Sequence, residues 1–332
     1  NISLQRARSG LSPAKHPGVI AELSSINSPS LIFFEKIIIE NIDRMVEIAE
    51  SPERLWPHIK THKSPAIVSI LLQKGISSFK CATIAEAEML ASTGAKNVLI
   101  AYPLVGPNIS RFSSLISLFP DTRFHALVDS EKAVSLLTNE LTSRGQSAGG
   151  FVDIDAGMRR TGVPMEKAAA VYRSLSSSNA LSVSGLHVYD GHNTQQDPEE
   201  RQAACDLCYH RVEELKRDLE ERGLQVPHMI FGGTPTFACY AGIPDTDLSP
   251  GTAVLYDWGY SERYPDLPFE PAALVLGRVI SISGNKRFTL DVGSKAIATD
   301  PAGQKGLIVE FPDAVPISQS EEHWVFESDS DP

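Results

Sequence analysis

Short apolar runs that alternate with amphipathic helical patterns are the feature that most limits how this chain can fold. Strand-like runs are predicted at residues 56–60, 78–81, 97–102, 123–128, 150–155, 181–187, 228–232 and 252–255. Helical periodicity separates them, at residues 64–75, 84–93, 107–119, 130–144, 164–177 and 197–223, with a short helix after Thr236. An open doubly wound sheet shares most of this pattern, but the count of eight strands favours an α/β fold closed as a parallel (β/α)8 barrel.

The chain after Asp257 is predicted to form a second, all-β domain over residues 258–332. Strand-like runs without intervening helices lie at residues 274–282, 287–292, 307–311 and 323–326. The barrel is assigned to residues 28–257, and its strand-like run at 30–35 could pair with the β domain. Residues 1–27 are interpreted as an N-terminal arm, because their sequence shows no clear periodicity.

Composition and charge exclude several classes of protein. The chain has 332 residues, of which 42% are hydrophobic and 21% charged, so it has apolar side chains for a large core. No apolar run approaches the roughly 18 residues of a membrane helix, and the first residues lack a signal-peptide core. The formal net charge of −11, without a basic stripe, argues against nucleic acid. We therefore expect a cytoplasmic protein with a small-molecule partner and no membrane or nucleic-acid partner.

Four cysteines are too few for a disulfide framework in a chain of this length. Cys205 and Cys208 form a CxxC pair inside the long predicted helix 197–223. Because a structural zinc site needs further ligands and no second CxxC occurs, the pair is predicted to be buried on a helix face.

Lys60 lies in the basic stretch His58-Ile59-Lys60-Thr61-His62-Lys63, between the first predicted strand and the helix that begins at Ser64-Pro65. In a barrel the carboxyl ends of the strands form the active-site rim. A lysine desolvated there among basic neighbours has a lowered pKa and can act as a nucleophile. This stretch alone is equally compatible with a solvated basic turn.

Polar residues also follow the fifth and sixth predicted strands. Arg159 and Arg160 lie in a glycine-containing turn that suits a bound anion or phenolate, although either could instead pair with Asp153 or Asp155. His187 and Tyr189 end the sixth strand and point to the same side, where a ring can stack on a flat cofactor. A histidine in that position is also compatible with a satisfied core residue.

Two glycine-rich turns, Gly232-Gly233-Thr234-Pro235-Thr236 and Ser249-Pro250-Gly251-Thr252, lie near the last two predicted strands. Such turns expose backbone amides and hydroxyls that bind phosphate, and barrels often place a phosphate site there. Together with Lys60 they suggest a phosphorylated carbonyl cofactor, for which pyridoxal 5'-phosphate (PLP) is the natural candidate.

These motifs resemble the D-threonine aldolase and D-serine dehydratase group of fold-type III PLP enzymes. The resemblance runs from about Ser28 to Glu327 and is most specific at residues 58–63, 81–88, 155–162, 232–236 and 249–252. It implies an alanine-racemase-like barrel with a second all-β domain, a D-amino acid substrate and a head-to-tail homodimer that shares its active sites.

The resemblance also implies roles for individual residues. Lys60 looks like the lysine that forms the Schiff base, and Arg160 like the arginine that contacts the cofactor's phenolic oxygen. Other cofactor-binding residues are implied by position: His187 and Tyr189 near the ring, and Gly233, Thr234, Gly251 and Thr252 at the phosphate.

Two departures from the family pattern matter for the chemistry. Alanine racemases carry an arginine opposite the pyridine nitrogen where this chain has Ser249, and a neutral residue there leaves the cofactor a stronger electron sink. Aldolases and dehydratases of the group also carry a C-terminal His-x-Asp or His-x-Cys pair that binds Mn, Mg or Zn. Residues 1–332 contain no such pair, so metal ligands are unknown: either the chain continues past Pro332 or the site is lost. Glu321 and His323 could face one way in a strand, but an exposed acidic edge fits them equally well.

The leading prediction is a PLP-dependent lyase that cleaves D-β-hydroxy-α-amino acids to glycine and an aldehyde, as D-threonine aldolase does. The alternatives are a D-serine dehydratase acting by β-elimination, an amino-acid racemase and an inactive PLP-binding homologue. The sequence indicates no residue that would remove the hydroxyl proton.

Overall fold

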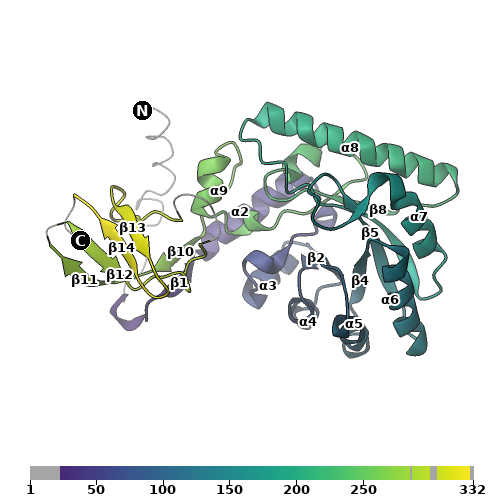
Figure 1. Cartoon of the computed structure of the whole chain (residues 1–332), viewed down its shortest axis with the longest axis horizontal. Coiled ribbons are helices and arrows are strands. Elements are labelled where there is room, and N and C mark those ends of the chain that lie inside the picture. The colour runs from purple at the N-terminus through teal and green to yellow at the C-terminus, as the bar shows by residue number, and fades with distance from the viewer. Residues whose placement is uncertain (1–22, 285, 300–304, 330–332) are drawn as a thin grey trace. The chain divides into compact units, whose positions relative to one another are not determined.

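The computed structural model describes residues 23–284, 286–299 and 305–329, coloured along the chain in Figure 1. The described chain forms two compact units: one comprises residues 42–253, and the other combines the chain up to Asn41 with the chain from Val254 onward. The predicted N-terminal arm lies almost entirely outside the described residues. Among these residues, no helix combines the length and apolarity needed to cross a bilayer.

The larger unit is built on a parallel sheet whose strands follow one another around a ring. Their order is β2 (Ser78–Cys81), β3 (Asn97–Ile100), β4 (Arg123–Val128), β5 (Ala148–Asp155), β7 (Leu181–Val188), β8 (His228–Phe231) and β9 (Asp247–Leu248), with β6 (Val163–Pro164) paired to β5.

An extended segment before Lys60 closes this ring. The Trp56 amide donates to the carbonyl oxygen of Leu248 in β9 at 2.8 Å, and the Lys80 amide in β2 donates to the carbonyl oxygen of Pro57 at 2.9 Å. Single parallel bridges join Leu55 to Leu248 and His58 to Lys80. The predicted barrel is therefore confirmed, with an irregular segment as its first strand.

Helices follow the strands and lie on the outer side of the sheet (Figure 1). They are α3 (Pro65–Gln73), α4 (Ile84–Thr93), α5 (Pro107–Leu118), α6 (Glu131–Ser143), α7 (Met165–Ser176) and α8 (Pro198–Glu221). Side-chain caps at Ser64, Thr83, Ser130 and Asp197 accept backbone N–H groups of the first turn and explain where four of them begin. Cys205 and Cys208 are buried in α8, as predicted.

Two strand predictions at the barrel rim were wrong. Residues Thr252–Val254 form the 3-10 turn η5, and the eighth strand is β9, whose two residues are too few to show periodicity. The first strand does not reach Lys60, because Ile59–Thr61 form the 3-10 turn η3. The His58 side chain caps this turn: its Nδ1 accepts the Lys60 amide at 3.2 Å.

The barrel interior below the rim is filled by large apolar side chains. Trp56, Leu99, Leu127, Phe151 and Ile230 form one buried cluster, in which the Trp56 and Phe151 rings meet edge to face with centroids 5.8 Å apart. This packing makes the interior a solid core, so a ligand can enter only at a rim.

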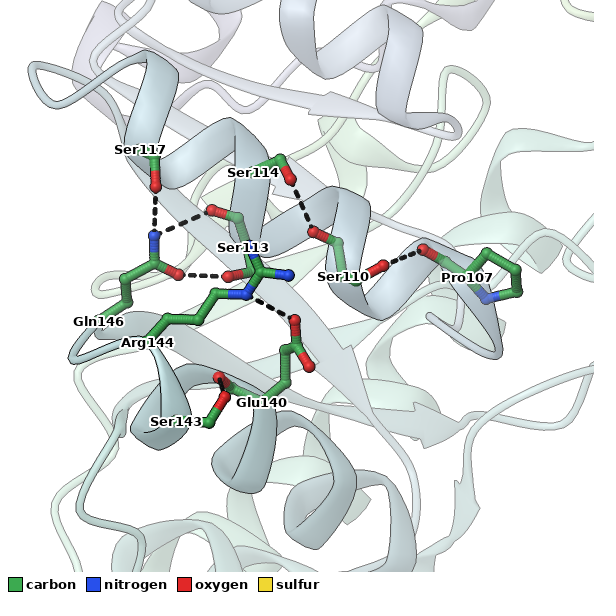
Figure 2. A network of polar contacts seen from close by, with 9 residues as sticks. All are labelled: Pro107, Ser110, Ser113, Ser114, Ser117, Glu140, Ser143, Arg144 and Gln146. Atoms are coloured by element: carbon green, nitrogen blue, oxygen red, sulfur yellow. Dashed lines mark hydrogen bonds and ion pairs between the residues drawn. The ribbon is translucent and has the colours of Figure 1, made fainter.

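A polar network ties α5 to the loop that leads into β5 (Figure 2). The Gln146 amide nitrogen donates to the Ser113 carbonyl oxygen at 3.0 Å and to Ser117 Oγ at 2.6 Å, and the Ser113 hydroxyl donates back to Gln146 Oε1. Arg144 and Glu140 pair at 2.9 Å beside it. These contacts satisfy polar groups on the outside of the barrel and fix the start of a strand that carries site residues.

The smaller unit is mostly β. β1 (Ser30–Phe33) pairs antiparallel with β10 (Ala273–Leu276), and a four-stranded antiparallel sheet has the order β11 (Val279–Ser283), β12 (Arg287–Leu290), β14 (Trp324–Glu327) and β13 (Val315–Gln319). The remaining α-helices of the described chain are α2 (Glu35–Ala49) and α9 (Trp258–Arg263). The predicted strand at 307–311 was wrong. The strand is β13, whose alternation is interrupted by Pro316 and by a register shift after it.

Candidate active site

A cavity at the carboxyl ends of the barrel strands collects side chains that lie far apart in the sequence. Four of its lining residues were predicted from strand-end motifs: Lys60, Arg160, His187 and Tyr189. They come together because parallel strands place all their carboxyl ends at one rim.

Lys60 lies in η3, exposed at this rim. Desolvation by the surrounding protein lowers its pKa, the nearby Arg160 charge lowers it further, and Glu86 opposes both. The predicted direction and its main cause, desolvation, are therefore confirmed, although the neighbouring charge that lowers the pKa is that of Arg160 and not of the basic motif.

The neighbouring histidines are not the cations that the basic motif indicated. Burial, with smaller contributions led by Lys80 and Lys60, lowers the pKa of His58 to about 2. Burial likewise lowers the pKa of His62 to about 4, and its Nδ1 accepts the Ser64 amide at 3.2 Å. Both imidazoles are consequently neutral at neutral pH and act as caps of the backbone.

The lowered pKa of Lys60 predicts how the apoprotein reacts with a carbonyl compound. Because only the neutral amine attacks a carbonyl, a lower pKa makes Lys60 reactive at a lower pH than a free lysine of pKa about 10.4. We expect the rate of PLP attachment to rise with pH, with a midpoint at a lower pH than for Nα-acetyl-lysine. The rate is measured by the growth of the absorption band of the imine that PLP forms with the amine. Equal midpoints for the protein and the model compound would contradict the desolvation of Lys60.

Arg160 lies against Tyr189, with its guanidinium carbon 5.4 Å from the ring centroid. The carboxylate at the end of β5 shapes the turn that carries this arginine, since Asp155 Oδ1 accepts the Gly157 and Arg159 amides at 3.0 and 2.9 Å. The turn thereby presents Arg160 to the cavity, as its predicted role requires.

Two cavity residues were missed by the sequence reasoning. Lys80 in β2 is only 2% exposed, and Asp153 in β5 is buried with one oxygen 2.7 Å from His187 Nδ1. The sequence feature that could have identified them is a charged residue inside a predicted strand, close to its carboxyl end, as in Ser78-Phe79-Lys80-Cys81. This run was predicted only as a strand.

The two glycine-rich turns are joined to each other. Thr234 Oγ1 accepts the amides of Gly251 and Ala253, each at 3.1 Å. The hydroxyl oxygens of Thr252 and Thr61 lie 3.3 Å apart, which brings the second turn next to Lys60. The predicted phosphate residues thus lie together beside the cavity, and their contact with a phosphate stays a prediction.

The residues present fit a flat phosphorylated ring such as PLP. A Cβ on Gly233 would lie 3.3 Å from the Tyr189 ring, and one on Gly251 would lie 3.0 Å from the His58 carbonyl oxygen, so a larger residue would narrow the space around the turns. The Ser249 hydroxyl is buried, and its oxygen has no hydrogen-bond partner within the described chain. A buried hydroxyl of this kind normally has a partner, which a ring nitrogen can supply. In residues 23–284, 286–299 and 305–329, no cluster of three or more His, Cys, Asp or Glu side chains is arranged to hold a metal.

A closed (β/α)8 barrel with a rim lysine, accompanied by a mostly β unit, defines the alanine-racemase-like class of folds. Comparison with known families agrees: residues 36–257 match the model described as alanine racemase, N-terminal domain, and the chain belongs to this family. Residues 272–332 match the model of a putative serine dehydratase domain. The resemblance to the D-threonine aldolase and D-serine dehydratase group is thereby confirmed.

Named relatives fall in the same group. The chain is 28% identical to the 3-hydroxy-D-aspartate aldolase of Paracoccus denitrificans (strain Pd 1222), covering 92% of this chain and 81% of the relative. It is 24% identical to the D-threo-3-hydroxyaspartate dehydratase of Delftia sp. (strain HT23), covering 84% and 74%. The crystal structure of D-threonine aldolase from Filomicrobium marinum superposes with a TM-score of 0.85 at 27% identity, covering 93% of this chain and 84% of that one.

Proposed function

We propose that this protein is a PLP-dependent lyase that cleaves D-β-hydroxy-α-amino acids to glycine and an aldehyde. The observation that carries the proposal is the accessible Lys60 amine with a lowered pKa, in a cavity that Arg160 also lines and next to the turn that carries Thr252. Its family membership and the aldolases and dehydratases among its relatives support the same reaction class.

Bound PLP would supply an electron sink for bonds at the substrate's Cα. The chain's own residues would bind and orient the cofactor. Lys60 offers a neutral amine to the carbonyl group, and Arg160 offers a permanent charge beside Tyr189 to the phenolic oxygen. The residues proposed to hold the phosphate are Gly233, Thr234, Gly251 and Thr252.

Dehydration of the same class of substrate is the second candidate. It is favoured by the match of residues 272–332 to a putative serine dehydratase domain and by the Delftia relative. Racemisation is the weaker alternative, because Ser249 places no cation where alanine racemases hold the ring nitrogen unprotonated. The head-to-tail homodimer and the cytoplasmic location stay predictions.

Product identification separates these reactions. PLP-loaded protein is incubated with D-threonine, 3-hydroxy-D-aspartate, D-serine and D-alanine, each with and without Mn²⁺, Mg²⁺ or Zn²⁺, and products are identified by mass spectrometry. We expect glycine and an aldehyde from the first two and no reaction of their L-enantiomers. A 2-oxo acid with ammonia would indicate the dehydratase, and racemised D-alanine the racemase. Failure to convert any substrate under all metal conditions would contradict a lyase.

A further inference from the structure

Lys80 is a second lysine in the same cavity as Lys60. It projects from the carboxyl-terminal half of β2, is 2% exposed and lines the cavity, with its Nζ 5.9 Å from the centroid of the Tyr189 ring. A buried lysine with no ion pair within 4 Å is uncommon, because burying an ammonium group is costly. No salt bridge of that length joins Lys80 to a carboxylate in the described chain. Packing alone therefore does not account for this residue.

Several ionisable groups face Lys80 from the surrounding elements. They are Lys60 in η3, His58 before it, Asp153 in β5, and His187 and Asp190 at the end of β7. Desolvation lowers the pKa of Lys80 to about 7, Lys60 lowers it and the two aspartates raise it. Because the aspartates stabilise the ammonium form while burial opposes it, the amine can gain and lose a proton near neutral pH.

We propose that Lys80 is the general base of this site, whose Nζ accepts the β-hydroxyl proton of the substrate as the Cα–Cβ bond breaks. This role rests on the function proposed above. The electron pair of the O–H bond becomes the second bond of the aldehyde carbonyl, and the electron pair of the Cα–Cβ bond stays with Cα. The Lys80 ammonium then returns a proton to Cα to complete glycine. Atoms and charges balance without a further reactant.

The other bases of the cavity suit this role less well. His58 has a pKa of about 2, and its Nδ1 already accepts the Lys60 amide. His187 is held by Asp153 through Nδ1, and burial lowers its pKa. Lys60 is free once the substrate amine has displaced it, but it lies exposed at the rim, whereas Lys80 is buried in the cavity. A general base works best with a pKa near the working pH, and Lys80, with a pKa of about 7, meets that condition.

The protonation of Lys80 can be measured without turnover. NMR spectra of apoprotein carrying ¹³C- and ¹⁵N-labelled lysine are recorded from pH 5 to 11, and the resonance missing from Lys80→Met identifies the residue. We expect it to titrate near pH 7, well below the pKa of about 10.4 of an ordinary lysine. Titration near pH 10 would overturn the proposal, because the amine would then be protonated during the reaction.

Kinetics test the catalytic role. Lys80→Met and Lys80→Arg should both lower kcat for retro-aldol cleavage by about 10²- to 10⁴-fold, since neither side chain can accept the proton. PLP attachment at Lys60, measured by borohydride reduction and peptide mass spectrometry, should persist in both and shows that the pocket is folded. Lys132→Met, at an exposed position of α6, is the matched control and should retain kcat.

The outcomes distinguish failure of the Lys80 role from failure of the proposed function. Loss of activity in Lys80→Met with full activity in Lys80→Arg would mean that only the positive charge at this position matters. That result would overturn the assignment of Lys80 as the general base. Full activity in both variants, with cleavage intact in the wild type, would overturn this role and leave the proposed function standing. A wild type that cleaves no D-β-hydroxy-α-amino acid would contradict both the role and the function, whatever the NMR titration gives.

Discussion

Replacing Lys60 by alanine is expected to abolish covalent attachment of PLP and, with it, all lyase activity. Among the two lysines that line the cavity, Lys60 is exposed at the rim and Lys80 is buried, so an incoming cofactor meets Lys60 first. Without that amine there is no covalent anchor that the substrate amine can displace, and activity should fall below detection.

Borohydride reduction followed by peptide mass spectrometry measures this attachment. The wild type should carry the reduced cofactor on Lys60, and Lys60→Ala should carry none. Lys63→Ala is the control: Lys63 belongs to the same motif, but its Nζ lies 3.2 Å from Glu86 and does not line the cavity. It should label like the wild type. Label on Lys80 in the wild type would refute Lys60 as the anchor.

Replacing Gly185 by alanine is expected to lower the stability of the barrel by more than about 4 kcal/mol, a range reached only through severe clashes or loss of packing. Gly185 lies in β7 with φ of 140°, and a Cβ there would lie 1.9 Å from the carbonyl oxygen of His228 in the paired strand β8. The clash is with backbone, so the β7–β8 pairing itself would have to shift. The same strand carries His187 to the cavity, and cofactor binding should weaken as well.

The midpoint of urea unfolding, followed by circular dichroism, measures this loss. Gly223→Ala supplies the control, because Gly223 also has a positive φ, 77°, but a Cβ there meets no atom within 4 Å. The Gly223→Ala variant should lose about 1 kcal/mol of unfolding free energy, because only the backbone conformation is strained. Equal shifts of the midpoint in the two variants would show that β7 and β8 can separate without penalty.

Local patterns predicted the helices well and the strands unevenly. Four of the helices after the strands begin at capping residues, among them Ser64 and Thr83, whose effect depends only on the next few residues. A strand was predicted at 252–255, where the turn η5 lies, and β9 was not predicted, because a two-residue strand is defined by its neighbours in the sheet. The segment at Trp56 became part of the barrel only through its bonds to Leu248 and Lys80.

The residues of the candidate site also differ in how far local sequence predicted them. Lys60, Arg160, His187 and Tyr189 were predicted because each follows or ends a strand with its own local motif, and the cavity brings all four together. Lys80 was missed, because its importance depends on groups from other strands.

The sequence by itself determined the alternation of most strands and helices, the caps that begin four of the helices, and the chemistry carried to several strand ends, because these depend on residues close together in the chain. Only the tertiary structure decided which side chains share a cavity and which of them carry charge there. His58 and His62 become neutral and Lys80 acquires a pKa of about 7 mainly because the folded barrel removes water from them. Desolvation is a property of the surrounding fold, so no local motif encodes it.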